Sequence, residues 1–462
     1  MIKQIKRPVH PKRRASERHR PERLDPSKAK KIVVIGTGYV GLVTGTGLAE
    51  WGHEVVCVDN NPAIVAALKK GEVPIFEPGL KELIDSNVAA KRLSFVGSLA
   101  GALDGAAAAF IAVGTPPRAE GDADLSYVYN AAEEIGKEMT GDLVVVNKST
   151  VPVGTGDEIE LILRDIQSKW RVSVASNPEF LREGAAVEDF LLPDRVVIGV
   201  EDDLAETVLH EIYAPVEQAG LPILVTRRRT AEIIKYAANA FLAVKIALIN
   251  EFADLCEAAG GDVVDVALAV GLDHRIGMDF LKAGPGFGGS CFPKDTTALL
   301  RTAQEHRVSM RVIESAVSGN HARKRAMAQK VIAALGGKAF HKRIAILGLA
   351  FKPETDDMRE APSIPLIEAL RRAGARIVAY DPEAAERAKE LLPGLEIARD
   401  PYACAKGADA VVIVTGWKQF KELDLDRLRA IVRQPILIDL QNLFEPAVVR
   451  KHGFNVHTIG RQ

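Results

Sequence analysis

The chain of 462 residues is long enough to form two to four domains with buried cores. Its 60 Lys and Arg nearly balance its 61 Asp and Glu, which argues against a protein whose body binds a polyanion. The four cysteines are far apart and lack zinc-site spacing, so we expect a reduced, cytoplasmic protein without structural metal. No apolar run approaches the roughly 20 residues that cross a bilayer, so no membrane span is expected.

The N-terminal stretch differs in composition from the rest of the chain. Residues 1–31 contain twelve Lys or Arg against three Asp or Glu, with several prolines and almost nothing apolar. This composition predicts a disordered basic arm over residues 1–30, with the fold beginning at Lys31. Such an arm can touch nucleic acid or anionic lipid, but a solvated tail or a mis-assigned start is the simpler interpretation. We therefore expect no nucleic-acid partner, except through this arm.

A glycine-rich turn follows the first apolar strand. Residues 31–35 lead into Gly36-x-Gly38-x-x-Gly41 and a helix, and a second strand ends at Asp59, 18 residues after the last glycine. In dinucleotide-binding folds these glycines make the turn, admit the pyrophosphate and pack the helix, while the acid binds a ribose hydroxyl. The acid also repels the 2′-phosphate of NADP. The pattern predicts an NAD site that includes Gly36, Gly38, Tyr39, Val40, Gly41 and Asp59.

Three further apolar runs, at residues 107–113, 143–146 and 172–175, predict strands that extend a parallel sheet. Polar segments with Thr115 and Thr150 follow the first two. Carboxyl ends of parallel strands line the ligand crevice in doubly wound folds, so both threonines are candidates for cofactor or water contacts, or ordinary turn residues. The third run leads into NPEFLREG, where Glu179 and Glu183 suit either a pocket rim or a solvated helix start.

Residues 230–258 predict one long helix, rich in Ala, Leu and Ile and free of Gly and Pro. Lys235 and Asn239 are four residues apart and therefore share one of its faces. A lysine with such apolar neighbours either extends its ammonium to solvent or serves a buried site. A helix of this length and composition is expected to bury a face against a second subunit, so we expect a homodimer.

The segment GPGFGGSCFPKD, residues 284–295, brings one cysteine to a junction between a loop and a helix. Pro293 suits the first helical turn, and apolar residues follow it. Backbone amides at a helix start favour a thiolate, and glycines let a substrate approach the backbone. Asp295 lies one helical turn after Cys291, so both side chains can face one pocket. Taken alone, Cys291 is a reactive thiol or a small buried residue in a turn.

A second α/β unit follows a predicted helical run that ends near residue 335. Strands are predicted at residues 343–347, 376–380, 410–414 and 436–439. The first leads to a turn at Gly348 and the second ends at Asp381, which echoes the N-terminal half without its full glycine motif. This pattern favours a nucleotide-binding domain with a different ligand over a structural lid, and Lys352 is a candidate phosphate ligand. The fold class is therefore α/β, with two Rossmann-like doubly wound domains joined by a long central helix.

One ordered set of motifs covers nearly everything from Lys31 to the end: GTGYVGL, VDNNP, FEPGL, VGTPP, KSTVPVGT, NPEFLREG, AANAF, PGFGGSCFPKD and GLAFKPETDDMRE. This set resembles the UDP-glucose 6-dehydrogenases, within the wider family of nucleotide-sugar dehydrogenases. The resemblance implies a four-electron, NAD-dependent oxidation of UDP-glucose to UDP-glucuronate for polysaccharide biosynthesis, with thiohemiacetal and thioester intermediates on the cysteine. It also implies an NAD-binding domain at residues 31–213, a central dimerisation region at 214–310 and a UDP-sugar-binding domain at 311–462.

The resemblance implies roles for individual residues. Cys291 is the nucleophile, while Lys235 and Asn239 stabilise the developing oxyanion. Asp295 acts with an ordered water as base, and Thr115 with Glu179 places that water. Whether Lys235 or Asp295 takes the first proton stays open. The implied substrate contacts are Phe180, Leu181, Glu183, Lys235, Asn239, Arg275, Phe280, Leu281, Lys282, Phe287, Gly288, Phe292, Phe351 and Lys352. The implied cofactor contacts beyond the glycine turn and Asp59 are Thr115, Thr150, Glu183 and Arg359.

One departure from the family pattern concerns the sugar. Gln441 stands where many relatives have an arginine, in an Asp-x-Arg-Asn pattern, so an expected cationic sugar contact is missing. The CFPKD motif nevertheless resembles the UDP-glucose branch more than the GDP-mannose or UDP-N-acetylmannosamine branches. Three alternatives stay open: a dehydrogenase of another nucleotide sugar (UDP-N-acetyl-hexosamine or GDP-mannose), a two-electron hydroxyacid dehydrogenase without need of Cys291, and a non-catalytic nucleotide-binding scaffold.

Overall fold

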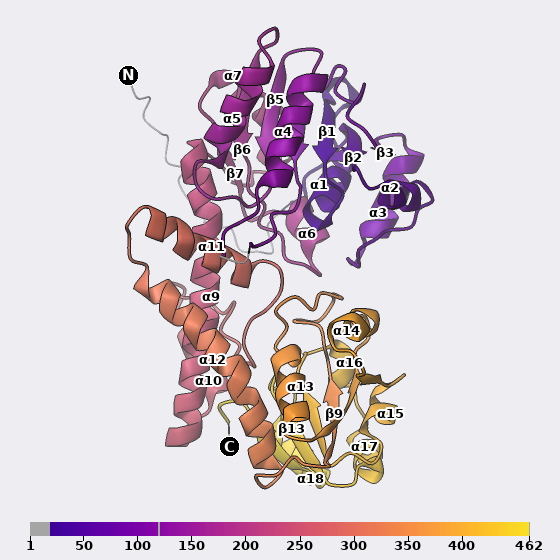
Figure 1. The fold of residues 1–462 in the computed structure, drawn as a ribbon, viewed down its shortest axis with the longest axis vertical. Helices are drawn as coiled ribbons and strands as arrows, with labels where there is room; N and C mark the ends of the chain where they lie inside the picture. The colour runs from indigo at the N-terminus through magenta and orange to yellow at the C-terminus, as the bar shows by residue number, and fades with distance from the viewer. Residues whose placement is uncertain (1–18, 119–120, 462) are drawn as a thin grey trace. The chain divides into compact units, whose positions relative to one another are not determined.

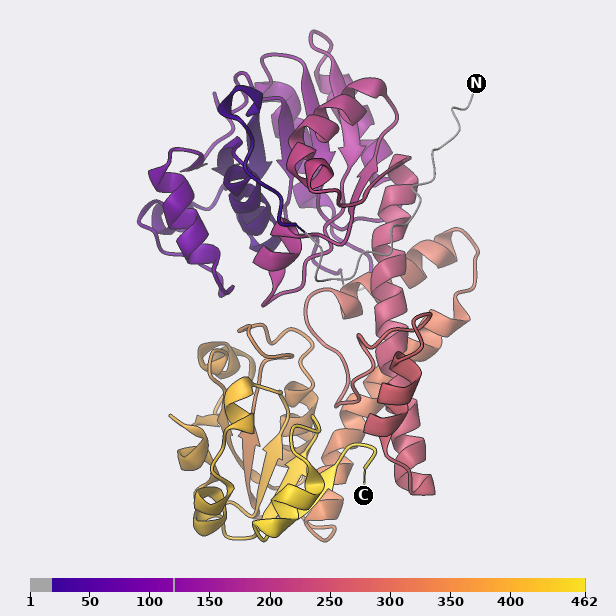
Figure 2. The same ribbon diagram turned by 180° about the vertical axis from the view of Figure 1, so that it is seen from behind.

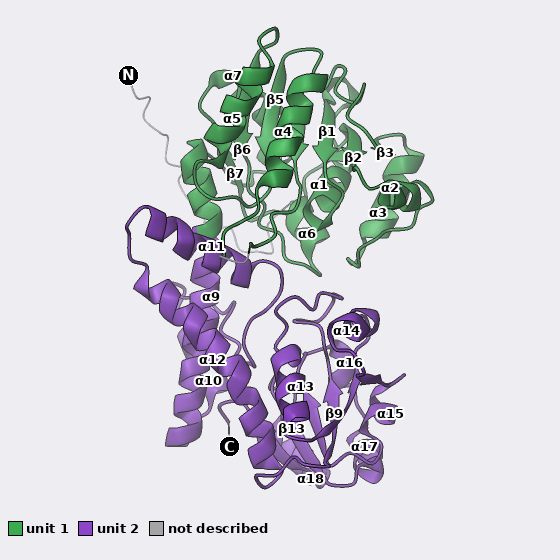
Figure 3. Cartoon of the chain, viewed as in Figure 1, with its two compact units in different colours: residues 1–236 green, residues 237–462 purple. Residues whose placement is uncertain are grey.

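The computed structural model describes residues 19–118 and 121–461. The chain divides into two compact units, residues 1–236 and 237–462 (Figure 3). The boundary falls within helix α9 (Arg228–Ala259), which is continuous through it and corresponds to the long helix expected from the sequence. Each unit contains its own sheet, so the predicted α/β class with two Rossmann-like sheets is confirmed.

The first unit is built on an eight-stranded sheet in the order β3-β2-β1-β4-β5-β6-β7-β8. Neighbouring strands pair in parallel except β6 and β7, which are antiparallel. The chain order reverses between β1 and β4, which is where doubly wound sheets bind their ligands. The strands are β1 (Lys31–Ile35), β2 (Glu54–Val58), β3 (Leu93–Val96), β4 (Ala108–Ile111), β5 (Leu143–Asn147), β6 (Val172–Ser176), β7 (Val196–Gly199) and β8 (Ile223–Thr226). The helices besides α9 are η2 (Pro26–Lys28), α1 (Tyr39–Glu50), α2 (Pro62–Lys69), α3 (Leu80–Ala89), α4 (Ser126–Glu138), α5 (Thr155–Ile166), α6 (Ala186–Leu191), α7 (Asp203–Ile212) and α8 (Ala214–Gln218).

Alternate residues of the central strands face two different cores. Ile32 and Val34 of β1 pack with residues of α1, α6, α7 and α8, whereas Val33 and Ile35 pack with residues of α4 and α5. Figure 1 shows α4 and α5 in front of the sheet, and Figure 2 shows the unit from its opposite side. Both faces of the sheet are buried, which explains why its strands are continuous apolar runs. Only the strand ends and the loops after them are left to bind a ligand.

Part of the N-terminal stretch belongs to the folded first unit. Leu24 is buried, and its backbone N–H donates to the carbonyl of Trp51 at 2.8 Å. Arg23 pairs with Glu50 at 2.7 Å, at the end of α1. The prediction of a disordered arm over residues 1–30 is therefore wrong for residues 19–30, because one buried leucine and specific backbone bonds outweigh the polar composition. Residues 1–18 lie outside the described residues, and the basic arm there stays a prediction.

The second unit combines helices with a six-stranded, fully parallel sheet in the order β11-β10-β9-β12-β13-β14. Its first strand, β9, has β10 on one side and β12 on the other, as β1 has β2 and β4 in the first unit. The strands are β9 (Arg343–Leu347), β10 (Arg376–Tyr380), β11 (Glu396–Ile397), β12 (Ala410–Ile413), β13 (Ile436–Asp439) and β14 (Asn455–Thr458). The helices are the remainder of α9, α10 (Val263–Gly271), α11 (Phe292–Glu305), α12 (Arg311–Ala334), α13 (Ser363–Arg372), α14 (Ala385–Leu391), α15 (Pro401–Ala405), α16 (Lys418–Lys421), α17 (Leu425–Ile431) and α18 (Pro446–Lys451).

Two other expectations from the sequence concern membrane spans and domain limits. Among the described residues, no helix combines the length and the apolar character needed to cross a bilayer. The domain limits at residues 213 and 310 stay predictions.

Candidate active site

The glycine turn joins β1 to α1 where the strand order reverses. Gly36 has φ of 94°, and a Cβ there would lie 2.8 Å from the carbonyl oxygen of Ala112. A Cβ at Gly41 would lie 1.9 Å from the carbonyl oxygen of Gly36, while at Gly38 it would meet nothing within 4 Å. Val40 packs its side chain against the core. The fold therefore requires the first and third glycines, whereas the second leaves open space at the start of α1, where a pyrophosphate fits.

Asp59 lies beside this turn, directly after β2. Its Oδ2 accepts hydrogen bonds from the N–H and the hydroxyl of Thr37 at 2.9 and 2.7 Å, and its Oδ1 accepts one from the N–H of Asn61 at 2.9 Å. A carboxylate has about four acceptor positions, so one remains for a ribose hydroxyl. The turn and the acid together fit a dinucleotide.

Tyr39, the first residue of α1, uses its hydroxyl inside the protein. The hydroxyl donates to the carboxylate of Glu77 and accepts from the N–H of Gly184 at 3.1 Å. Glu77 also accepts from the N–H groups of Gly184 and Ala186, each at 2.7 Å. Burial, together with the hydrogen bond to Glu77, raises the pKa of Tyr39. These bonds tie the glycine turn to the segment that contains the half-buried Glu183.

Glu179 and Lys235 form a buried ion pair. Lys235 Nζ lies 2.7 Å from Glu179 Oε1, and the two side chains are 4% and 5% exposed. Glu179 Oε2 accepts from the N–H of Leu181 at 2.6 Å. Burial raises the pKa of Glu179, but the charge and hydrogen bond of Lys235 outweigh it, so this pKa lies below its usual range. Phe180 packs its ring against Arg195, whose guanidinium lies 3.7 Å from the ring centroid. The ammonium of Lys235 therefore lies in a buried ion pair and does not extend to solvent.

A second buried lysine lies near this pair. Lys148, directly after β5, donates from Nζ to Asn177 Oδ1 at 2.9 Å and to the hydroxyl of Tyr213 at 3.3 Å. Burial lowers the pKa of Lys148 to about 8, with the charge of Lys235 acting in the same direction and that of Glu179 opposing it. The sequence analysis missed this residue. Its signal was the lysine of KSTVPVGT, but one sequence cannot separate a buried lysine from an exposed one.

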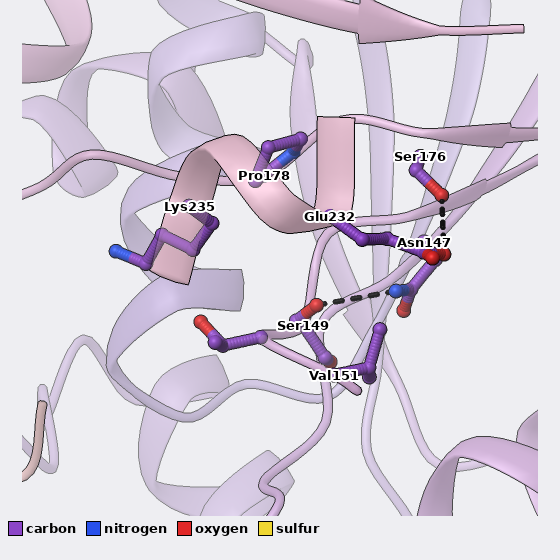
Figure 4. Close-up of a pocket in the computed structure, with 8 residues that line it drawn as sticks. Asn147, Ser149, Val151, Ser176, Pro178, Glu232 and Lys235 are labelled. Carbon is purple, nitrogen blue, oxygen red and sulfur yellow. Dashed lines mark hydrogen bonds between the residues drawn. The ribbon is translucent and has the colours of Figure 1, made fainter. Parts of the chain in front are cut away.

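Thr115 and Thr150 follow β4 and β5 and contact each other. The hydroxyl of Thr115 donates to the carbonyl of Thr150 at 2.9 Å, so Thr115 supports the backbone of the second segment. Thr150 lines a pocket between the ends of β5 and β6 and the start of α9 (Figure 4). The residues that line it are Asn147, Ser149, Thr150, Val151, Ser176, Pro178, Glu232 and Lys235.

Cys291 lies in the second unit, where it is the N-cap residue of α11. The side chain is half-buried, with Sγ 3.4 Å from Ser290 Oγ. Asp295, one turn along, is 1% exposed and accepts from Asn239 Nδ2 at Oδ2 and from Lys294 Nζ at Oδ1, each at 2.6 Å. The structure therefore brings Asn239 and Asp295 into direct contact, one helical turn from the thiol, as the spacing predicted for Asp295. Lys235 is four residues before Asn239 on α9.

Tight packing fixes the cysteine loop. A Cβ at Gly288 would lie 2.4 Å from a carbonyl oxygen of the segment after β9, and one at Gly289 would lie 2.6 Å from the ring of Phe351. Asn320 of α12 accepts from the N–H of Phe287 at 2.8 Å and donates to its carbonyl at 3.0 Å. Glycines are required here because the backbone is pressed against its neighbours.

Aromatic rings surround the same loop. The ring of Phe292 lies 5.9 Å from that of Phe280 and 6.0 Å from that of Phe287, measured between centroids. Leu281 is buried, Lys282 is exposed, and Lys352 Nζ lies 5.1 Å from the centroid of the Phe351 ring. The rings of Phe280, Phe287, Phe292 and Phe351, all predicted substrate residues, therefore gather around this loop.

Comparison with known proteins identifies the family to which the chain belongs. Sequence models of the UDP-glucose/GDP-mannose dehydrogenase family match residues 30–217 (NAD binding domain), 229–322 (central domain) and 345–446 (UDP binding domain). The chain belongs to this family. It is 56% identical to the UDP-glucose 6-dehydrogenase of Rhizobium meliloti, over 93% of this chain and 99% of that one, and 46% identical to that of Pseudomonas aeruginosa, over 93% and 97%. Its fold matches a UDP-glucose dehydrogenase from Pyrobaculum islandicum with a TM-score of 0.87, at 39% identity over 94% and 98% of the two chains.

The second unit has the same strand order around β9 as the first unit has around β1, but it matches the UDP binding domain of the family and not its NAD binding domain. Asp381, the counterpart of Asp59, accepts at Oδ2 from the N–H groups of Leu349 and Ala350 at 2.6 and 3.1 Å and from Trp417 Nε1 at 3.2 Å. Its Oδ1 accepts from two further backbone N–H groups. This carboxylate is saturated by protein donors, so no acceptor position is left for a ribose.

Arg275 and Arg359, which have predicted ligand contacts, and Gln441, which replaces an expected arginine, all have their side chains engaged within the protein. Arg275 and Arg359 are exposed, and each pairs with an aspartate two residues earlier. Gln441 donates from Nε2 to the carbonyl of Val414 at 2.7 Å, so its amide faces the backbone after β12. The ligand contacts of Arg275 and Arg359 stay predictions, as does the loss of a sugar contact at Gln441.

Proposed function

We propose that the protein oxidises the C6 alcohol of UDP-glucose to the carboxylate of UDP-glucuronate with NAD. Membership of the family and the UDP-glucose 6-dehydrogenase names of the curated relatives support this substrate. The observation that carries the proposal is the cysteine loop, because a half-buried thiol at the start of α11, one turn from a buried Asp295–Asn239 pair, suits covalent catalysis.

The first unit supplies the NAD site. Gly38 at the start of α1 would hold the pyrophosphate and Asp59 a ribose hydroxyl, with Thr115, Thr150 and Glu183 as further contacts. The family pattern adds Arg359, which belongs to the second unit. NAD, when bound, accepts the hydride in each of the two oxidations.

The chain's own residues perform the remaining chemistry. In each oxidation the proton of the hydroxyl being oxidised passes to Lys235 or Asp295 as the hydride leaves. Lys235 and Asn239 stabilise the negative charge that develops on the oxygen at C6. Cys291 adds to the aldehyde to form a thiohemiacetal, whose oxidation gives a thioester, and water attacks that thioester to release the acid. Asp295 takes the proton of the attacking water. Glu179 helps to place this water, and Thr115 does so by supporting the backbone of Thr150.

The test is the amount of NADH formed per UDP-glucose consumed, with limiting sugar and excess NAD. Two per sugar is expected for the four-electron oxidation. One per sugar indicates a simple alcohol dehydrogenase in which Cys291 has no role. No turnover with UDP-glucose, but turnover with another member of a panel of UDP- and GDP-sugars, supports the second candidate that Gln441 raises, a different nucleotide-sugar dehydrogenase.

The assembly and location complete the proposal. We infer a homodimer, since α9 carries exposed apolar side chains at Phe241, Leu248, Phe252 and Leu255, which recur at helical spacing on one face. We infer a cytoplasmic location from the four cysteines, all of which are free thiols. The division into residues 31–213, 214–310 and 311–462 belongs to the same proposal.

A further inference from the structure

Glu232 lies on α9, three residues before Lys235, and is almost fully buried. Its two carboxylate oxygens accept three hydrogen bonds. Oε2 accepts from the backbone N–H of Gly154 at 2.7 Å, and Oε1 accepts from the backbone N–H of Gly156 and the hydroxyl of Ser176, each at 2.9 Å. Figure 4 shows the bond between Glu232 and Ser176 in the pocket that Lys235 also lines.

The two backbone bonds cap helix α5 from outside. The N-cap residue of α5 is Gly154, which has no side chain to accept from the first amides of the helix. Glu232 supplies the acceptor that Ser or Asp would supply locally, and it places negative charge at the positive end of the helix dipole. A Cβ at Gly156 would lie 2.9 Å from Glu232 Oε1, so the carboxylate fits because this position is a glycine.

Because the three groups that face Glu232 are all donors, both of its side-chain oxygens must act as acceptors. Burial raises the pKa of this carboxyl, and the hydrogen bonds from Gly154, Gly156 and Ser176 oppose that shift. An amide in the same place would turn one of its own N–H groups toward an N–H or O–H donor, and one of the native hydrogen bonds would be replaced by a repulsion.

Glu232 joins three segments of the chain, and each contains or adjoins one residue of the proposed reaction: Thr150, Glu179 or Lys235. Gly154 and Gly156 follow the segment that contains Thr150. Ser176 ends β6, three residues before Glu179, and Glu232 is itself about one helical turn before Lys235. One carboxylate therefore holds the β5–α5 loop, the end of β6 and the start of α9 together.

We propose that Glu232 is a positioning residue, which fixes Lys235 on α9 relative to Glu179 and Thr150. The proposal rests on the role of Lys235 in the proposed function. The Lys235–Glu179 pair is 2.7 Å long and buried, so a small shift of α9 against the strand ends would misplace the ammonium that stabilises the oxygen at C6. Glu232 acts on turnover through this geometry, without contact with the substrate.

The experiment compares Glu232→Gln with Asp157→Asn in the full-length protein. Asp157, in the first turn of α5, pairs with Arg228 and Arg229 of α9 at 2.9 and 2.7 Å, so its loss loosens the same two helices without removing the cap. For Glu232→Gln we expect kcat to fall by about 100-fold, the loss associated with a misplacement of about 1 Å. The KM values for UDP-glucose and NAD should stay within about threefold, because Lys235 acts mainly on charge that develops in the transition state and the other binding contacts are unchanged. Asp157→Asn should keep kcat near that of the wild type, with a comparable loss of Tm.

Several results would overturn the proposal. An unchanged kcat for Glu232→Gln would contradict the positioning role. Equal losses of kcat in Glu232→Gln and Asp157→Asn, at equal losses of Tm, would mean that general loosening of the two helices lowers turnover. If Glu232→Gln does not fold, Ser176→Ala takes its place, since it removes one donor only; a lower kcat at constant KM supports the proposal and an unchanged kcat contradicts it. If the wild type leaves UDP-glucose unoxidised, the proposed substrate alone fails, and the comparison is made with the nucleotide sugar that the wild type does oxidise.

Discussion

At the scale of single residues, the thiol of Cys291 separates a four-electron from a two-electron enzyme. Cys291→Ser should stall after the first oxidation or trap an adduct, because serine is a far weaker nucleophile than cysteine at neutral pH. The measurement is NADH per UDP-glucose in a single turnover, with an expected fall from two toward one or below. Ser290→Ala is the matched control, since it removes the hydroxyl 3.4 Å from Sγ and keeps the thiol. Full conversion by Cys291→Ser would exclude the covalent mechanism.

Asp59 should determine the affinity for NAD. Asp59→Ala removes the acceptor for a ribose hydroxyl and the bonds to Thr37, so the KM for NAD should rise by at least about tenfold, as expected for a lost hydrogen bond to a charged group. Discrimination against NADP should weaken, because the repelling carboxylate is gone. Asp426→Ala is the control, since its carboxylate is 80% exposed, pairs with His452 and lies in the other unit. Equal cofactor kinetics in the wild type and Asp59→Ala would reject the ribose role.

At the scale of elements, Lys148, directly after β5, should make the free energy of unfolding depend on pH. The pKa of this lysine is about 8 in the folded protein and roughly 10.4 when unfolded. Between these values the unfolded chain binds more protons, so the free energy of unfolding rises with pH, by on the order of 3 kcal/mol in total. Below pH 8 the cost of the buried charge is fully present.

Lys148→Met tests this dependence, since methionine removes the charge and keeps most of the length. Thermal unfolding at pH 8 and pH 10 gives the change in Tm for each protein. The wild type should lose less stability, or gain more, than the variant on going to pH 10, because only the wild type carries a buried lysine that loses its proton over this range. Tyr213, to which Lys148 donates, stays protonated, because burial raises its pKa above this range. Identical shifts in the two proteins would show that Lys148 is not buried as a cation.

The elements also show what the sequence alone could establish. Long apolar runs predicted β1, β2, β4, β5 and β6 correctly, and in the second unit β9, β10, β12 and β13. The strands β3 and β14 were missed because they are edge strands in which buried and exposed residues alternate, and β11 because it has two residues. The strand β7 is an apolar run of only four residues, too short for its period to indicate a strand, and β8 is half-buried throughout, so neither was predicted.

The candidate site divides in the same way. The glycine turn and the Cys291–Asp295 spacing are local in the sequence, so a pattern could predict them. The contacts of Glu232 with Gly154 and of Lys148 with Tyr213 join residues 78 and 65 positions apart. Such pairs depend on tertiary packing, which a single sequence does not encode in any short-range period. The burial that determines the pKa of Lys148 is of the same kind.

At the scale of the whole molecule, the exposed apolar face of α9 bears on the number of subunits. Leu248 and Leu255 are 49% and 58% exposed and lie on one face, two helical turns apart, with Phe241 and Phe252 on the same face. A contiguous apolar face of this kind on a monomer would be exposed to water at a cost of about 25 cal/mol per Å². A second copy of the chain is the partner that we infer.

The double variant Leu248→Glu/Leu255→Glu should therefore separate the subunits, because four glutamates would be buried without partners in a symmetric interface. Light scattering coupled to size exclusion should give about twice the chain mass of 49.9 kDa for the wild type and a value near the single mass for the variant. The matched control is Leu161→Glu on α5, which adds a charge at an apolar side chain that is 67% exposed on another helix, and it should leave the dimer intact. A wild type of single mass, or a dimeric double variant, would remove α9 as the interface.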